Sequence, residues 1–128
     1  RAAREAGRCL ARLAAEQDLT VFEYWLTDWA GHHPARHHPE QVLSELDRFL
    51  EGVMEGWPAG RTLVLASDHG NLEDLSSRRH SLNPALCVWW GPPAARPLRD
   101  LSDLAPALLA ALGIPDAPEG EPSGEARP

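Results

Sequence analysis

The sequence predicts an α/β fold with a partial, mostly parallel sheet that is flanked by helices. Two observations lead to this prediction. Helix-type and strand-type segments follow one another along the 128 residues in the order helix, strand, helix, strand, strand, helix, which is the pattern of layered α/β domains. The strand-type segments are also nearly continuous in their apolarity, as in strands that helices cover on both faces of a parallel sheet.

Three segments have helical character. Residues 1–17 are rich in alanine and carry a short apolar stripe at helical spacing. A second helix is expected to begin at Pro39, which suits a first turn, and its apolar residues recur at i, i+3, i+4 and i+7. The third spans residues 101–112, with Ser102 or Asp103 as its N-cap.

Three short segments rich in apolar, β-branched and aromatic residues are predicted to be strands: residues 19–27 (LTVFEYWLT), 61–67 (RTLVLAS) and 85–90 (ALCVWW). After Ile114 the sequence is dominated by Pro, Gly and Glu and has almost no apolar residue. We therefore expect residues 1–114 to form the folded part and residues 115–128 to form a flexible tail.

The charge balance restricts the classes of partner. Twelve Lys and Arg residues stand against nineteen Asp and Glu residues, which gives a formal net charge of -7. A surface of that sign repels phosphate backbones, so nucleic acid is not an expected partner. The sequence contains no apolar stretch of membrane-spanning length and no signal-like segment, so we expect no membrane partner and a cytoplasmic location.

The first residues with metal-binding chemistry are Asp28 and His32, in the motif D-x-x-x-H. One carboxylate and one imidazole suit Zn²⁺ or Mn²⁺, and both side chains can reach one ion if the residues between them form a tight turn. The alternative is that Asp28 only caps a turn while His32 is solvated.

Asp68 and His69 directly follow a predicted buried strand and precede Gly70. Two consecutive metal-binding side chains at a strand end point in different directions, so they can contact two neighbouring ions or one ion from two sides. The alternative is a turn-capping Asp beside a surface His. A hydrolase triad is excluded, because the consecutive residues of Ser67-Asp68-His69 cannot align nucleophile, base and orienting group.

His80 becomes interesting as a third imidazole beside those of His32 and His69. All these candidates lie in loops next to the predicted strands, where open α/β sheets bind their ligands. His33, His37 and His38 make the first of these loops unusually rich in histidine. We expect them to face solvent or to line the mouth of the site, with a role behind the ligands or toward a substrate phosphate as the alternative.

The segments YWLTDWAGH, LVLASDHGNLED, RHSLNPALCVWWGP and DLAPALLAALGIP, in this order, resemble the C-terminal half of the alkaline phosphatase superfamily. They are most similar to the branch that includes cofactor-independent phosphoglycerate mutase and phosphopentomutase. The resemblance covers roughly residues 5–115.

The resemblance implies a role for each matching residue. Asp28, His32 and His80 would hold one divalent ion, and Asp68 and His69 would hold its neighbour, with Zn or Mn as the metals. Asn71 and Glu73 would stand behind the ligands. The substrate would be a small phosphorylated compound or phosphate ester.

The family's Ser or Thr nucleophile and a further Asp ligand have no counterpart in this sequence. The resemblance therefore implies a phosphoryl-transfer or phosphate-ester-hydrolysing enzyme of which this chain is one part, inactive alone and partnered by the missing N-terminal half of the same domain. The start at Arg1, inside a helix-like run, favours a segment of a longer chain, with a processed N-terminus as the alternative. Two other hypotheses are a non-catalytic metal-binding or interaction module derived from that family, and an α/β domain whose histidines are incidental.

Overall fold

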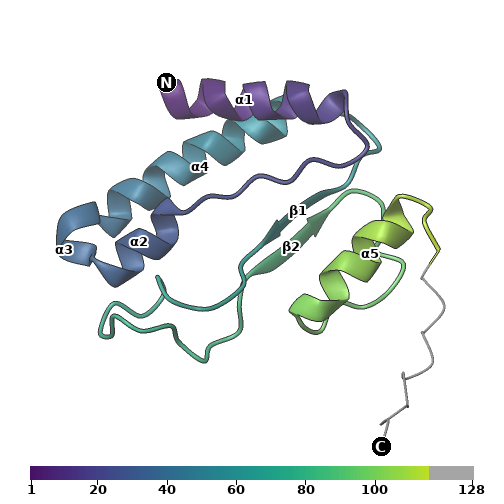
Figure 1. Cartoon of the computed structure of the whole chain (residues 1–128). Helices are drawn as coiled ribbons and strands as arrows, with labels where there is room; N and C mark the ends of the chain where they lie inside the picture. The colour runs from purple at the N-terminus through teal and green to yellow at the C-terminus, as the bar shows by residue number, and fades with distance from the viewer. Residues whose placement is uncertain (116–128) are drawn as a thin grey trace, which may run out of the picture. The chain divides into compact units, whose positions relative to one another are not determined.

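A computed structural model describes residues 1–115, which fall into two compact units (Figure 1). The first unit is Arg1–Pro92 and the second is Pro93–Pro128. Of the predicted tail, only Pro115 is described, and residues 116–128 lie outside the described part. None of the described helices is long and apolar enough to span a bilayer.

Four helices belong to the first unit: α1 (Ala2–Ala15), α2 (Leu26–His32), α3 (Pro34–His37) and α4 (Pro39–Gly56). Pro39 begins α4 as predicted, because its fixed φ suits a first helical turn. The residue before it, His38, has a left-handed backbone with φ 44°. This residue separates α3 from α4 and ends the shorter helix.

Helix α1 packs along α4, and glycines allow the two backbones to touch (Figure 1). A Cβ atom at Gly7 would lie 2.0 Å from the carbonyl oxygen of Phe49, and one at Gly52 would lie 1.9 Å from that of Arg4. The apolar side chains buried in this unit are correspondingly small, apart from Phe49: Ala11, Ala14, Ala30, Val42, Phe49 and Val53. The helix pair therefore depends on close backbone approach rather than on large interlocking side chains.

The sheet of the described residues has two strands, β1 (Leu63–Ala66) and β2 (Cys87–Trp90). They run antiparallel, with Leu63 opposite Trp90 and Ala66 opposite Cys87. Beyond the strands, an isolated bridge pairs Gly70 with Ser81. These pairings bring the two ends of the long loop between the strands together.

The α/β class is confirmed, but the mostly parallel sheet is not, because β1 and β2 are antiparallel. Residues 19–24 of the first predicted strand have no regular structure, and α2 begins within the rest of it. A strand needs a neighbour for its backbone hydrogen bonds, and this segment pairs with none in residues 1–115. Val21 is 76% exposed and Phe22 is 52% exposed, although the Phe22 ring stacks on that of Phe49.

The second unit contains the short 3₁₀ helix η1 (Leu101–Asp103) and helix α5 (Leu104–Ala111). Asp103 is the N-cap of α5, one of the two residues expected, although its side chain makes no capping hydrogen bond to that helix. The 3₁₀ turn before α5 is capped by Asp100, whose carboxylate accepts a hydrogen bond from the Ser102 backbone N–H at 2.8 Å. Asp103 completes a reciprocal capping box, and this capping starts the turn at Leu101, the first residue of the predicted helix.

We predict that Gly7→Ala and Gly52→Ala each destabilise the chain. Helix propensity alone would make either change stabilising by about 1 kcal/mol, but the added methyl meets backbone atoms that cannot rotate away. The expected net loss in the free energy of unfolding is about 1–3 kcal/mol, measured by urea denaturation. Ala6→Ser, on the exposed side of α1, is the control and should change the value by less than about 0.5 kcal/mol. A stabilised Gly7→Ala variant would contradict the close helix contact.

Candidate metal centre

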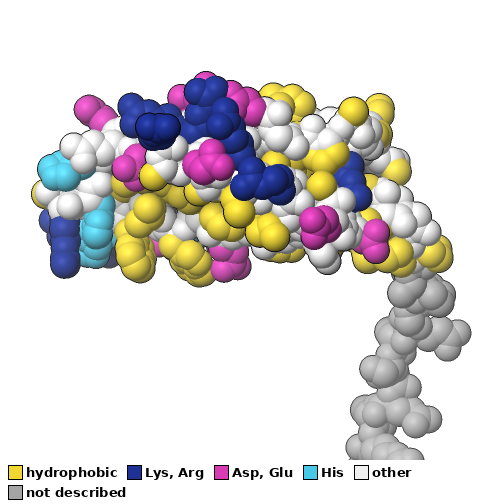
Figure 2. Space-filling model, turned by 90° about the horizontal axis from the view of Figure 1, so that it is seen from above, with side chains coloured by type: hydrophobic (Ala, Val, Ile, Leu, Met, Phe, Trp, Pro, Cys, Tyr) yellow, Lys and Arg dark blue, Asp and Glu magenta, His cyan; other side chains and the backbone are white. Residues whose placement is uncertain are grey.

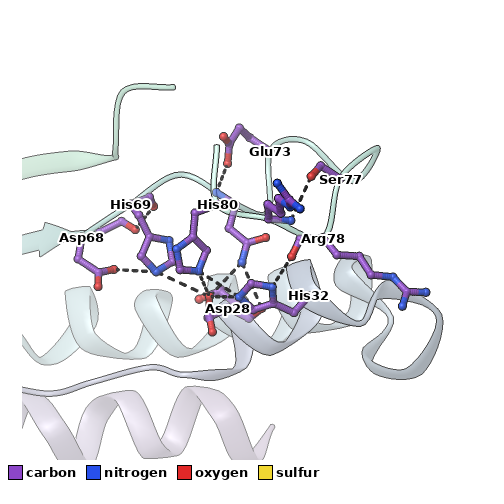
Figure 3. Close-up of polar contacts among 12 residues, drawn as sticks. Asp28, His32, Asp68, His69, Glu73, Ser77, Arg78 and His80 are labelled. Carbon is purple, nitrogen blue, oxygen red and sulfur yellow. Dashed lines mark hydrogen bonds and ion pairs between the residues drawn. The ribbon is translucent and has the colours of Figure 1, made fainter. Parts of the chain in front are cut away.

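Three imidazoles surround one carboxylate oxygen (Figure 3). Oδ1 of Asp28 lies 3.3 Å from Nε2 of His32, 3.8 Å from Nε2 of His69 and 3.6 Å from Nε2 of His80. Asp28, His69 and His80 each offer a ligand atom within 4.8 Å of the other two. Side chains from Asp28 to His80, 52 positions apart in the sequence, thus lie close together.

Asp28 and His32 both belong to α2, one helical turn apart. The tight turn that the sequence suggested is therefore an α-helical one, and its i, i+4 spacing places both side chains on the same face. The position of Asp28 directly after a strand is not confirmed, because a helix surrounds it. The two side chains nevertheless lie next to each other, as the motif predicted, because Nε2 of His32 lies beside the Asp28 carboxylate.

His69 follows β1 and His80 precedes β2. Their immediate neighbours Gly70 and Ser81 form the isolated bridge, in which the Ser81 backbone N–H donates to the Gly70 carbonyl at 2.9 Å. The two imidazole rings consequently stack, with centroids 3.5 Å apart and an interplanar angle of 14°. The β pairing thus sets the relative positions of these two histidines.

The ring of His32 is held in one tautomer. Its Nδ1 lies 2.6 Å from the backbone carbonyl oxygen of Arg78, and a carbonyl can only accept, so Nδ1 carries the proton. The lone pair is then on Nε2, which faces Nε2 of His80 at 3.1 Å. A backbone carbonyl behind a ligating imidazole is the usual arrangement at metal sites, because it fixes the ring and the tautomer.

The residues fit a divalent cation. The donor set combines one carboxylate oxygen with imidazole nitrogens, which suits Zn²⁺ or Mn²⁺. Nδ1 of His69 is buried and has no hydrogen-bond partner among the described residues, so protein contacts alone leave this ring incompletely satisfied. The cluster therefore offers a divalent cation one carboxylate oxygen and three imidazole nitrogens.

Asn71 holds the Asp28 carboxylate in place. Its side chain is the buried polar group of the described core, at 5% exposure. Its Nδ2 donates to Oδ1 of Asp28 at 2.9 Å and contacts the Asp28 carbonyl oxygen at 3.4 Å. Gly31 leaves room for this contact, since a Cβ at that position would lie 2.1 Å from Oδ1 of Asn71.

Glu73 connects the loop of His69 to the loop of His80. Its carboxylate accepts hydrogen bonds from the Asn71 backbone N–H at 2.7 Å, from the Ser81 hydroxyl, and from Nδ2 of Asn83 at 3.1 Å. These donors, the Ser81 hydroxyl first, lower the pKa of Glu73 from 4.5 to about 2. Glu73 therefore remains ionised and keeps both loops together throughout the neutral range.

The structure brings Asp28, His32, His69 and His80 together and leaves Asp68 at the edge. The Asp68 carboxylate is 72% exposed and lies 3.5 Å from Nε2 of His69. The division of the ligands between two ions stays a prediction. The described structure shows no hydrogen bond or ion pair between the cluster and the remaining candidates His33, His37 and His38.

Four contributors were not found from the sequence: the carbonyl of Arg78, the space at Gly31, and the side chains of Ser81 and Asn83. A backbone carbonyl leaves no mark in a sequence, since every residue has one. Ser81 and Asn83 lie in the segment RHSLNP, so their nearness to His80 was visible, but their shared partner Glu73 was not.

We predict that Glu73→Gln lowers the midpoint of thermal unfolding at pH 7. Because the pKa of Glu73 is about 2 in the folded chain and 4.5 ordinarily, its ionised form stabilises the fold above about pH 4.5. That contribution is lost as the pH falls toward 2, so the gap between wild type and variant should narrow over this range. Glu23→Gln is the matched control, since Glu23 is exposed and makes no ion pair within the described part of the chain. A gap that stays constant from pH 7 to pH 2.5 would argue against the role of this carboxylate.

Comparison with known proteins identifies the family to which this chain belongs. Residues 2–116 match the family model of the metalloenzyme superfamily. A 2,3-bisphosphoglycerate-independent phosphoglycerate mutase of Ruegeria pomeroyi is 34% identical over 84% of this chain and 23% of its own length. Such mutases of Desulforudis audaxviator and Methanosarcina acetivorans are 30% and 28% identical, over 91% and 83% of this chain and 25% and 22% of their own lengths.

The chain thus spans about a quarter of the length of the curated relatives it matches. No solved structure matches it significantly. The family match covers nearly all the described residues, including every member of the cluster around Asp28. The chain belongs to the metalloenzyme superfamily, in the phosphoglycerate mutase branch of the alkaline phosphatase superfamily.

Proposed function

We propose that this chain is the metal-binding part of a two-metal enzyme that transfers phosphoryl groups or hydrolyses phosphate esters. The observation that supports it best is the convergence of three imidazole nitrogens on Oδ1 of Asp28. Family membership supports the same conclusion, since the superfamily is one of metalloenzymes and the relatives compared above are phosphoglycerate mutases.

In this proposal Asp28, His32 and His80 hold one divalent ion, and Asp68 and His69 hold a second, with Zn or Mn as the metals. Bound ions of this kind polarise phosphoryl oxygens and lower the pKa of an attacking hydroxyl. The chain's own residues supply the preorganisation. The Arg78 carbonyl keeps the Nε2 lone pair of His32 directed at the cluster, and the Asn71 amide orients the Asp28 carboxylate.

The substrate is proposed to be a small phosphorylated metabolite, because the named relatives act on phosphoglycerate. The nucleophile, a Ser or Thr, and a further Asp ligand are proposed to come from sequence outside these residues. The partial coverage of each relative, 22–25% of its length, supports this division.

Exposed apolar side chains favour the presence of further sequence of the same domain, which would cover them. Leu19, Val21 and Trp25 are 50%, 76% and 61% exposed, and a cluster of this kind normally marks a contact surface. We propose that the rest of the same domain covers them and pairs with residues 19–24, which would give the mostly parallel sheet. Residues 1–114 would then be one part of that domain, and residues 115–128 a tail.

We expect the chain to bind Zn²⁺ or Mn²⁺ and Asp28→Asn to weaken that binding at least tenfold, because a neutral amide replaces the anionic ligand. Isothermal titration with each metal measures the effect. Asp47→Asn, an exposed carboxylate on α4, is the control and should leave the affinity unchanged. Unchanged binding by Asp28→Asn would remove the cluster from the proposal.

Turnover distinguishes an enzyme part from a non-catalytic module. The longest gene product that contains this sequence should show phosphoglycerate mutase or aryl phosphatase activity, while the 128-residue chain should bind metal without turnover. In the longer protein, His80→Ala should lower kcat/KM at least about 100-fold, since a metal ion contributes several kcal/mol of transition-state stabilisation. Stoichiometric metal without activity in the longer protein would favour the module instead.

A further inference from the structure

Histidine side chains also gather outside the central cluster, at the α3 end of the first unit (Figure 2). His33 lies between α2 and α3, His37 ends α3, and His38 separates α3 from α4. These residues were expected to face solvent or a substrate. The structure distinguishes His33 and His37 from His38, because among these three only His33 and His37 have ring contacts with other described residues.

His33 is the N-cap of α3, with a non-helical backbone (φ -135°, ψ 61°), and His37 is the last residue of that helix. The His37 backbone N–H donates to the His33 carbonyl at 3.1 Å, which holds the two residues close together. Their ring centroids are 6.4 Å apart. H-x-x-x-H at this spacing is the arrangement by which one helical face supplies two imidazoles to zinc.

Trp29 limits the motion of this pair. The His33 backbone N–H donates to the Trp29 carbonyl at 2.9 Å, which continues the helical hydrogen bonding from α2. The indole lies against the His37 ring, with centroids 6.0 Å apart. One face of His37 is thereby covered, while the side chain of His33 is exposed.

The surroundings contain imidazoles but no carboxylate. No described Asp or Glu lies within 4.0 Å of the His33 or His37 ring nitrogens. His33 also lies beside His32, with ring centroids 6.5 Å apart, and His32 lies 5.0 Å from His80 by the same measure. A continuous row of imidazoles thus runs from the exposed pair to the central cluster.

We propose that His33 and His37 form an accessory site for a Zn²⁺-class cation at the outer end of this row. With Zn–N bonds of about 2.0–2.1 Å, a tetrahedral ion holds two ring centroids roughly 5 Å apart, so a small rotation of His33 closes the site. Imidazole ligands without a carboxylate select Zn²⁺, Ni²⁺ or Cu²⁺ over Mn²⁺. The site goes beyond the proposed function, because neither residue belongs to the cluster around Asp28.

Zinc titration of the 128-residue chain tests this site. Wild type should show a tighter class of binding, which comprises the ions of the central cluster, and a weaker class at His33 and His37. His33→Ala combined with His37→Ala should weaken the second class at least tenfold while the first is unchanged. Mn²⁺ should show only the first class. His37→Cys, which keeps a zinc ligand, should retain the second class, and circular dichroism should show unchanged helix content in each variant.

His38→Asn is the matched control, since asparagine tolerates the left-handed backbone of residue 38, and it should bind zinc as wild type does. Zinc binding by the His33/His37 double variant that equals wild type would overturn the accessory site. Asp28→Asn separates the two proposals: it should remove only the tighter class. The inference would also be overturned if Asp28→Asn lost the weaker class of zinc binding while the His33/His37 double variant kept it. That result would assign the weaker class to the central cluster.

Discussion

The contact between Asn71 and Asp28 joins the helical side of the candidate site to its loop side. Asp28 belongs to α2, and Asn71 belongs to the loop that follows β1. The amide reaches both the side chain and the backbone of Asp28, and it is buried, so water does not compete for these hydrogen bonds. His32 on α2 meets His69 and His80 on the loop because this contact sets the distance between the two elements.

The contact between Asn71 and Asp28 requires a residue without a Cβ atom at position 31. Gly31 lies against the Asn71 side chain, and any Cβ there would overlap its oxygen. On the loop side, Glu73 accepts hydrogen bonds from three donors and keeps its charge because those donors lower its pKa to about 2. The histidines are thus positioned by residues that do not themselves need to bind a metal. That arrangement is the usual means of preorganising a metal site.

The part of the fold that carries the site has few large buried side chains. The α1–α4 pair is held by backbone contact at Gly7 and Gly52 and by ion pairs of Glu55 with Arg4 and Arg8 on its exposed side. Few large side chains are buried, and several large apolar ones are exposed. These features occur in a chain that spans about a quarter of the length of its mutase relatives.

The sequence by itself determined the α/β class, the start of α4 at Pro39 and the choice of Asp28, His32, His69 and His80 as candidates. These depend on local propensity and on the chemistry of single side chains, which a sequence displays directly. The parallel sheet could not be determined, because an apolar run such as residues 19–27 becomes a strand only when a neighbour accepts its hydrogen bonds. Only the tertiary structure decided that the loops after β1 and before β2 meet, that the Arg78 carbonyl fixes the His32 tautomer, and that Asn71 fits against Gly31. Each of these depends on atoms distant in sequence, whose separation is set by packing and not by residue type.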